Sequence, residues 1–234
     1  MKKTVLLAMI GFTAFSCSSS IDGEGVATAQ KNFTIDQITD LDINCNCNVT
    51  LISGSEVGVK AESHQNILDN LIVEGNNGKL VIEEKSAVDQ SSAYDVFVYV
   101  TRDLKDLSLT GLTALKVSGT LNVDDLEIET HDQAKMDNSY VITNNLKLST
   151  YDQSVVDLKG TSLALIYTGE NQSKGELFAF ETNDAQVYTA DNAILNINSR
   201  KSLAGSVKGN SMVTYIGEPS KDTKIADNAQ VIKK

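Results

Sequence analysis

The chain has 234 residues, of which 41% are hydrophobic and 22% are charged, so it can bury a core and its composition argues against bulk disorder. Its formal net charge is −11, and its only arginines are Arg102 and Arg200. Nucleic acids and anionic membrane surfaces attract clustered Lys and Arg, so we expect this chain to bind neither. Tryptophan is absent and aromatic residues make up 6%, which predicts an aliphatic core.

Residues 1–16 resemble a bacterial lipoprotein signal peptide. Lys2 and Lys3 precede an apolar run over residues 4–15 that is too short to span a bilayer as a stable helix. The run ends in AFSC, which resembles a site where cleavage precedes a cysteine that is then acylated. We therefore expect Cys17 to be lipidated and to anchor an outer-membrane lipoprotein, either periplasmic or surface-exposed. The alternative is a plain secretory signal with an incidental cysteine.

The rest of the chain is predicted to be an acylated tether followed by one domain. Residues 17–30 are small, polar and unpatterned, which is typical of a flexible link. Over 31–105 we expect irregular N-terminal coils that contain one short helix in HQNILDNL, a hairpin or coil turn at the Asn-Asn-Gly of VEGNNGKLVIEE, and a strand in YDVFVYV. Regular coils are expected over 106–234.

Two cysteines, Cys45 and Cys47, lie in the segment INCNCNVTL, where apolar and polar residues alternate with the period of a strand. Both thiols fall on the apolar face of that strand. Neighbouring same-face positions on one strand fit disulfide geometry poorly, so we expect buried, unpaired thiols. A metal or redox role is the alternative, although His64 is the only nearby histidine.

A three-residue turn signature recurs along the C-terminal half at spacings of 20, 19, 20, 18 and 18 residues. Short runs with strand periodicity flank each copy, and helical periodicity is not sustained anywhere in this region. The copies are Asp132-Gln133-Ala134, Asp152-Gln153-Ser154, Asn171-Gln172-Ser173, Asp191-Asn192-Ala193, Gly209-Asn210-Ser211 and Asp227-Asn228-Ala229, with a weaker one at Gly111-Leu112-Thr113.

A fixed period of this length is typical of a solenoid in which each coil buries its apolar face against its neighbours. We therefore predict an all-β, single-stranded parallel β-helix with coils of about 18–21 residues. Antiparallel sandwiches also space their turns regularly, but they give no reason for one particular turn to recur every second or third bend.

Stacking assigns a role to each slot of the signature. Asp, Asn or Gly in the first slot tolerates left-handed backbone geometry, and a small residue in the third slot allows a tight bend. The second slot carries amides in six successive copies, which predicts a hydrogen-bonded ladder one strand spacing apart. The alternative is that the first-slot aspartates bind Ca²⁺. Asn171 and Gly209 interrupt that row, so we expect structural turns and no metal site.

Four segments resemble the putative auto-transporter adhesin head GIN domain family over roughly residues 31–234. They are FTIDQITDLDI leading into NVTLISG, then NILDNLIVEGNNGKLVI, VYVTRDLKDLSLTG and GNSMVTYIGEP. The resemblance implies a right-handed parallel β-helix in a lipoprotein or secreted bacterial protein. This chain departs from the family pattern at its Asp-Gln-Ala turns and at CNCN, so surface roles tied to those residues need not carry over.

These observations favour a non-enzymatic, adhesin-like or scaffolding protein that binds a glycan or an envelope protein and uses no cofactor. A carbohydrate-active enzyme and a passive spacer are the alternatives. The best carboxylate cluster is Asp125, Glu127 and Glu129, which we interpret as a solvated face. His131 is interpreted as a surface packing residue beside Tyr151 rather than as a catalytic base. Fold alone licenses no activity.

Overall fold

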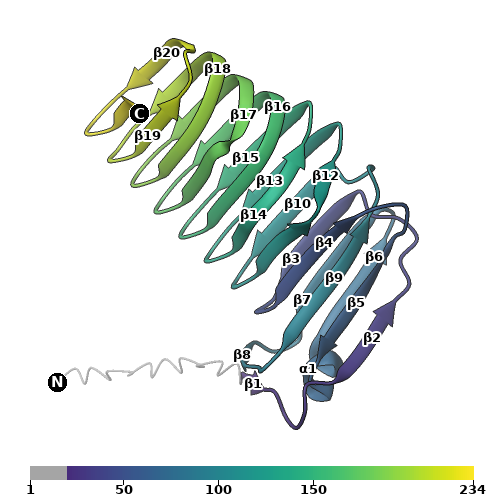
Figure 1. The fold of residues 1–234 in the computed structure, drawn as a ribbon. Helices are drawn as coiled ribbons and strands as arrows, with labels where there is room; N and C mark the ends of the chain where they lie inside the picture. Colours follow the sequence, from purple (N-terminus) through teal and green to yellow (C-terminus); the bar gives the residue numbers. More distant parts are fainter. Residues whose placement is uncertain (1–19) are drawn as a thin grey trace, which may run out of the picture.

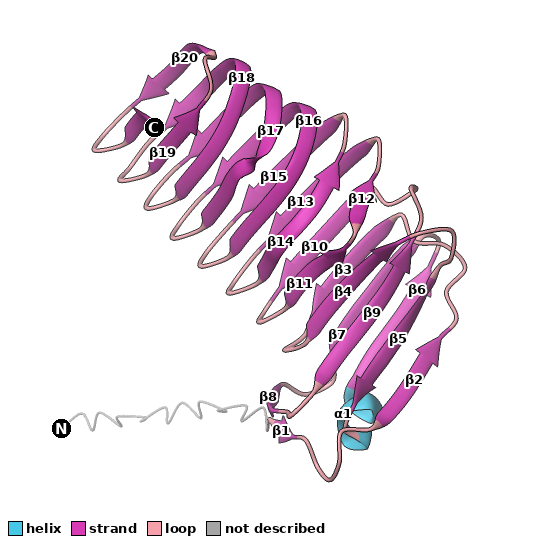
Figure 2. Cartoon of the chain, in the orientation of Figure 1, coloured by secondary structure: helices cyan, strands magenta, loops and turns pink. Residues whose placement is uncertain are grey.

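Residues 20–234 are described by the computed structural model, and the predicted signal peptide and Cys17 lie outside them. The chain forms a parallel β-solenoid of about six turns, preceded by a head at the N-terminal end (Figure 1). Strands dominate the described chain, and a single short helix, α1 (Gln65–Asn70), lies in the head (Figure 2). The predicted β-helix of stacked coils is therefore confirmed.

The coils build two long faces, here named sheet A and sheet B. In spatial order, sheet A consists of β6 (Leu71–Asn76), β7 (Lys79–Glu84), β3 (Asp40–Asn44), β10 (Asp106–Thr110), β13 (Asp125–Thr130), β15 (Asn145–Thr150), the second halves of β16 (Val155–Gly169), β17 (Lys174–Thr189) and β18 (Ile194–Val207), and β20 (Ser220–Ile225).

Sheet B consists of β2 (Ala29–Phe33), β5 (Gly58–Ser63), β9 (Tyr94–Val100), β4 (Asn48–Ser53), β11 (Ala114–Ser118), β14 (Lys135–Ile142), the first halves of β16, β17 and β18, β19 (Met212–Ile216) and β21 (Gln230–Lys233). A short strand, β12 (Thr120–Asn122), pairs with the end of β14. Each coil therefore contributes one stretch to each sheet.

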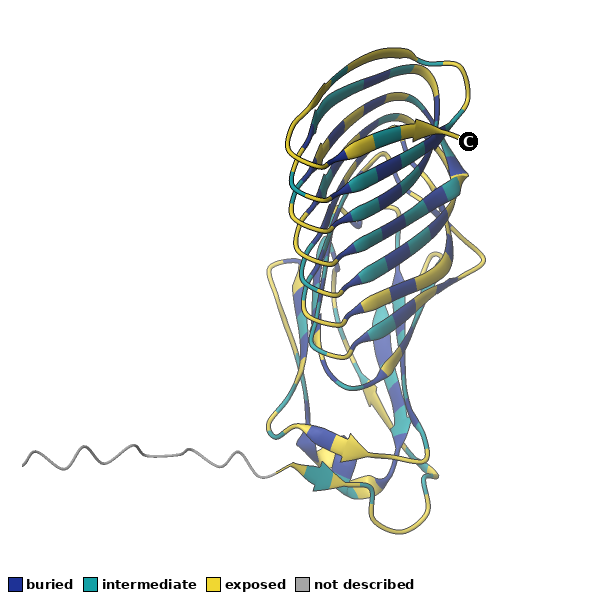
Figure 3. Ribbon diagram, turned by 90° about the vertical axis from the view of Figure 1, so that its left-hand side faces the viewer, coloured by how far each residue is buried: buried dark blue, intermediate teal, exposed yellow. Residues whose placement is uncertain are grey.

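The core lies between the two sheets and is mainly aliphatic, as the composition predicts. Alternate residues of each strand point inward, and Figure 3 shows buried and exposed residues alternating along the coils. Leu41, Leu107, Ile128, Leu148 and Tyr167 occupy equivalent positions on five successive coils, and all five are buried. Because each coil repeats the inward pattern of the one before, the apolar contacts form one continuous column.

Glycines occur where the backbones of successive coils approach most closely. Gly160 and Gly205 have φ angles of 117° and 126°, which side chains rarely allow. A Cβ on Gly160 would lie 1.9 Å from the carbonyl oxygen of Val141, and one on Gly205 would lie 2.0 Å from that of Val187. Glycine at these positions lets the backbones of β16 and β18 adopt this conformation without a clash against the adjacent coil.

The head differs from the irregular coils that the sequence analysis predicts for residues 31–105. Its outer strands pair antiparallel: β2 with β5, β5 with β9, and β6 with β7. The short helix, the Asn-Asn-Gly hairpin and the YDVFVYV strand are confirmed as α1, the β6–β7 hairpin and β9. Within this range β3 and β4 continue the parallel coils. The prediction of coils needs correction for the outer strands, because hairpins alternate polar and apolar residues just as coils do.

The predicted flexible tether, residues 17–30, also needs correction in its described part. β1 (Ile21–Asp22) pairs in parallel with β8 (Val88–Gln90), and β2 already begins at Ala29. Small polar residues gave no periodic signal here, because a two-residue strand is too short to show one.

Candidate functional site

The seven recurring turns stack along one edge of the solenoid, here named the turn edge. It comprises residues 111–113, 132–134, 152–154, 171–173, 191–193, 209–211 and 227–229. The first residue of every turn has a positive φ, between 56° at Asp132 and 70° at Gly209. The third residue of every turn is buried, and its small side chain leaves room for the backbone of the adjacent coil. The turns therefore share one backbone conformation, as their common sequence suggests.

Aspartates of the turn edge connect successive coils. From Gln133 onward, the N–H of the second residue of each turn donates to a carbonyl of the coil before; Gln153 N–H, for example, donates to Asp132 O at 2.8 Å. The N–H of the third residue donates within its own turn, as Ser154 N–H does to Tyr151 O at 3.1 Å. The N–H of the first residue lacks such a partner. In four turns the carboxylate of the following turn accepts it instead: Asp132 Oδ2 from Gly111 (3.1 Å), Asp152 from Asp132 (3.2 Å), Asp191 from Asn171 (3.4 Å) and Asp227 from Gly209 (3.0 Å).

The turn signature predicts a role for these aspartates within their own turns and does not predict this contact between coils. The available signal was that a carboxylate occupies the first slot in the coil after Gly111, Asp132, Asn171 and Gly209. A carboxylate that accepts a backbone N–H satisfies a donor that would otherwise rely on water. Within residues 20–234, no group of three or more His, Cys, Asp or Glu side chains is arranged to hold a metal ion.

The predicted amide ladder is only partly present. Asn210 Nδ2 donates to Asn192 Oδ1 at 3.3 Å, and Asn228 Nδ2 donates to Asn210 Oδ1 at 3.1 Å. Gln133, Gln153 and Gln172 make no amide-to-amide bond in the described structure, so a six-member ladder is wrong. The shorter Asn side chain holds its amide close to the backbone, where the strand spacing sets the contact, whereas Gln has one more rotatable bond to fix.

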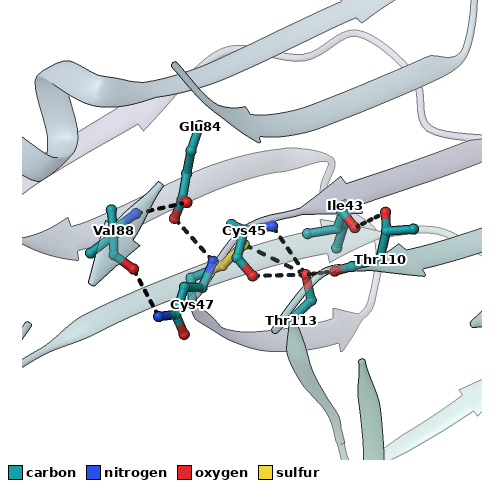
Figure 4. The surroundings of a disulfide bond; sticks show 8 residues. Ile43, Cys45, Cys47, Glu84, Val88, Thr110 and Thr113 are labelled. Carbon is teal, nitrogen blue, oxygen red and sulfur yellow. Dashed lines mark hydrogen bonds between the residues drawn. A yellow bond between two sulfur atoms is a disulfide. The ribbon is translucent and has the colours of Figure 1, made fainter. Parts of the chain in front are cut away.

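Cys45 and Cys47 form a disulfide, which corrects the prediction of unpaired thiols (Figure 4). The chain bends between β3 and β4 instead of continuing as one strand, and the two Cα atoms are 5.3 Å apart. An extended strand would separate them by about 6.6 Å. The alternation of INCNCNVTL predicts a strand on each side but carries no signal for the bend between them.

The disulfide bend stacks on the turn edge one coil before Gly111. Cys45 N–H donates to Thr113 Oγ1 at 3.1 Å, and the Thr113 hydroxyl lies 3.0 Å from Cys45 O. On the other side, the Glu84 carboxylate accepts the N–H groups of Asn46 and Val88. Burial raises the pKa of Glu84, although these two hydrogen bonds oppose the shift. The bend is therefore fixed from both neighbouring layers.

A cluster of carboxylates lies on the outer surface of sheet A, here named the acidic cluster: Asp40, Asp42, Asp106, Glu127 and Glu129. These residues line a shallow hollow of about 170 Å³ that also includes Lys79. Asp106 is in register with Asp40 on one side and with Glu127 on the other. Three strands, β3, β10 and β13, thus bring together acids that are up to 89 residues apart in the sequence.

Electrostatic repulsion within the acidic cluster is only partly relieved. Partial burial raises the pKa of Asp106, and the neighbouring carboxylates of Asp40 and Glu127 raise it further. Lys79 Nζ lies 3.5 Å from Asp42, and Lys147 pairs with Glu127. The sequence pattern groups Glu127 and Glu129 with Asp125, which instead accepts a hydrogen bond from Asn145. Asp40, Asp42 and Asp106 were missed because only the coil register places them there.

His131 packs against the turn edge as the sequence analysis interprets it. Its ring stacks on Tyr151 of the next coil, with the ring centroids 4.7 Å apart and an interplanar angle of 14°. Nε2 lies 2.6 Å from Glu129 Oε1, and Nδ1 lies 3.8 Å from Asp152 Oδ2. The two rings occupy equivalent slots of adjacent coils, so stacking follows directly from the repeat.

A family model described as "Putative auto-transporter adhesin, head GIN domain" matches residues 37–219. The chain belongs to this family. The resemblance of the four sequence segments is thereby confirmed. The family description indicates an adhesin-like protein of the cell surface or envelope, and it names no glycan or protein partner.

Solved structures of several bacterial proteins share the fold. A putative adhesin from Bacteroides fragilis superposes with a TM-score of 0.81 at 14% identity, covering 92% of this chain and 99% of the other. A putative lipid binding protein from Parabacteroides distasonis gives 0.71 at 16% identity, with 92% and 100% covered. A putative adhesin from Parabacteroides merdae gives 0.68 at 16% identity, with 92% and 99% covered. Identities this low establish the shared fold alone.

The comparison with curated protein sequences finds no match. Among residues 20–234, no helix is long and apolar enough to cross a membrane.

We predict that Asn210→Ala lowers the free energy of unfolding by about 1 kcal/mol, because it removes both amide contacts of the middle rung. The matched control is Gln153→Ala, which removes a second-slot amide that lacks such contacts and should cost less than about 0.5 kcal/mol. Urea unfolding followed by circular dichroism measures both. Equal losses in the two variants would contradict the three-residue ladder.

Asp106→Asn should stabilise the protein at pH 7, by about 0.5 kcal/mol or less because the group is largely solvated. The pKa of the Asp106 carboxyl is raised above its ordinary value of 3.8, so the protonated form favours the folded state. This contribution to stability is fully present below pH 3.8 and is lost as the pH rises through the folded-state pKa. The gain should therefore vanish below pH 3.8.

Melting temperatures at pH 7 and below pH 3.8 test this expectation for Asp106. Asp222→Asn is the matched control on the same sheet, because the residue in register with Asp222 is Ala204 rather than an acid. An Asp106→Asn gain that is independent of pH would show that repulsion within the acidic cluster is not its cause.

Proposed function

We propose that this protein is a non-enzymatic, adhesin-like component of the cell envelope that binds a glycan or a protein through the outer surface of sheet A. The observation that carries the proposal is the acidic cluster, where five carboxylates from three strands line one hollow. Repulsion between these carboxylates raises the free energy of the unbound protein. A partner with cationic or hydrogen-bond-donor groups would relieve that repulsion on binding, which favours the complex.

The same sheet offers apolar contact surface further along the solenoid. Ile166 is 41% exposed and Tyr188 is 43% exposed, and they lie on adjacent strands two register positions apart. The Tyr188 hydroxyl donates to Gln186 Oε1 at 3.1 Å, which orients the ring. An exposed aromatic ring beside amides and hydroxyls suits sugar faces and peptide side chains alike. A partner lying along sheet A would meet acidic groups at the head end and this apolar pair beyond them.

A test of the binding face uses the domain from Cys17 onward in a glycan array and in an envelope pull-down. The double variant Asp42→Asn/Glu127→Gln should weaken binding of any partner found by about tenfold or more, since each removed charge is worth roughly 1 kcal/mol at a desolvated interface. The matched control, Asp137→Asn/Asp157→Asn, removes two acids from sheet B and should leave binding unchanged. Equal losses in both pairs would indicate a net-charge effect instead of a binding face.

A carbohydrate-active enzyme is the second candidate, because Asp40 and Asp106 form a carboxyl pair in which the pKa of Asp106 is raised. Paired carboxylates are the catalytic groups of glycoside hydrolysis. The glycan panel also tests this candidate, since an enzyme would release new reducing or unsaturated sugar ends. That product would have to disappear in Asp106→Asn. Binding without products favours the adhesin-like function.

For localisation, we propose an outer-membrane lipoprotein anchored through acyl chains on Cys17. The disulfide supports an oxidising compartment, because such bonds are rare in the cytosol. The family description supports a place in the envelope. The acidic composition offers no attraction to an anionic lipid surface, so acyl chains would have to supply the membrane affinity.

Cys17→Ser should release the protein from membranes, because the anchor is removed while residues 20–234 keep their fold. Cell fractionation with a high-salt wash, followed by immunoblotting, measures the outcome. Ser18→Ala is the matched control and should stay in the membrane fraction. A Cys17→Ser protein that still sediments with washed membranes would contradict lipid anchoring.

A further inference from the structure

Residues 21–24, here named the latch, are bound to the head along their whole length. Ile21 N–H donates to Ala87 O at 2.9 Å, and Gly23 N–H donates to Gln90 O at 2.8 Å. These bonds add the latch to β8 as a short parallel strand. The segment just after the expected lipid anchor is therefore part of the fold.

Side chains from α1 and from the residue before it hold the other side of the latch. Asn66 Nδ2 donates to Asp22 O at 2.7 Å, and Asn66 Oδ1 accepts the N–H of Glu24 at 3.0 Å. His64 Nδ1 lies 3.2 Å from Glu24 O, and its ring fills the space beside Gly23. A Cβ on Gly23 would lie 2.3 Å from the His64 ring, so this close approach requires glycine.

The latch leaves a very short link to the anchor. Three residues, Ser18, Ser19 and Ser20, separate Cys17 from Ile21. Four residue steps span at most about 14 Å even when fully extended. A flexible tether over residues 17–30 would have allowed the domain to tumble freely, whereas this link is shorter than the diameter of a small domain.

The latch also lies at one extremity of the molecule. Figure 1 shows β1, β8 and α1 together at the outer end of the head, with β20 and the last coils at the opposite end. We propose that the latch holds this end of the head against the lipid surface and directs the solenoid, with sheet A, away from the membrane. This inference rests on the proposed lipid anchor at Cys17.

The surface around the latch does not itself attract an anionic bilayer. Asp22, Glu24, Asp69 and Asp89 lie there, with Lys85 as a nearby cation. The short covalent link therefore sets the orientation, with no contribution from charge attraction. Val26, which is 76% exposed in the loop after the latch, adds one apolar side chain at the same end.

Energy transfer to a membrane dye tests the orientation. Residues 17–234, which contain the whole described fold, are coupled through the Cys17 thiol to a maleimide lipid in phosphatidylcholine vesicles. Cys45 and Cys47 are joined in the disulfide, so Cys17 is the single free thiol. A donor is attached by click chemistry either at Gln65 on α1 or at Lys224 on β20, both of which are exposed. We expect transfer from Gln65 to exceed transfer from Lys224 several-fold.

Two variants, each with the same Gly-Ser linker inserted at a different position, test whether the short link between Cys17 and the latch sets the orientation. About 20 residues between Ser20 and Ile21 would add a mean reach of about 25 Å and should largely abolish the difference between the two labels. The same linker inserted after Gly25 leaves both the latch and the short link intact and should preserve the difference. Gly23→Leu should behave like the first insertion, because it expels the latch from the His64 ring.

Equal transfer from Gln65 and Lys224 in the unmodified protein, or no effect of the linker at Ser20, would overturn the proposed orientation. Chemical coupling makes this result independent of acylation in cells. A failure of Cys17 lipidation would appear only in the fractionation of Cys17→Ser, and a failure of the latch only in the vesicle measurement.

Discussion

The parallel backbone ladder between successive coils is the interaction on which the rest of this structure depends. Each coil donates to and accepts from the next at the strand spacing of about 4.8 Å, so every side chain stands above its equivalent in the coil before. Equivalent positions must therefore be compatible with themselves. Aliphatic residues stack on aliphatic residues in the core, small residues stack beneath the turns, and in four turns a carboxylate accepts a first-slot N–H group that the ladder leaves unpaired. Repulsion between stacked acids in the acidic cluster is the unfavourable consequence of the same rule.

The ladder also explains which features the sequence could predict. The turn signature recurs at a nearly constant spacing, so the stacked coils, the buried third slot and the left-handed first slot follow from the pattern alone. The acidic cluster does not, because Asp40 and Asp106 become neighbours only after 51 intervening residues, 54–104, have left the solenoid to form most of the head and returned. No local sequence pattern predicts that residues 54–104 lie outside the regular coils. The bend at Cys45–Cys47 was likewise hidden by an alternation that continues through it.

The head covers the N-terminal end of the solenoid. A solenoid that simply began would expose unpaired strand edges and the open end of an aliphatic column. Here β3 and β4 form a first coil, and β7 and β9 pair with them in parallel. Outside these strands the chain adds β6, β5 and β2 in antiparallel pairing. Ile67 and Leu68 of α1 are buried against this end of the core. Hairpins can close the column because they need no further coil, whereas parallel strands always require another crossover.

The nearly constant length of the repeat has a consequence for how such proteins can diverge. Because the first slot of each turn meets the first slot of the next, removing or duplicating one whole repeat rejoins surfaces that already fit each other. The molecule can thus change its reach in steps of one strand spacing while its head stays the same. Selection for a longer or shorter projection from the cell would then act on the number of repeats, leaving the chemistry of each one free to vary.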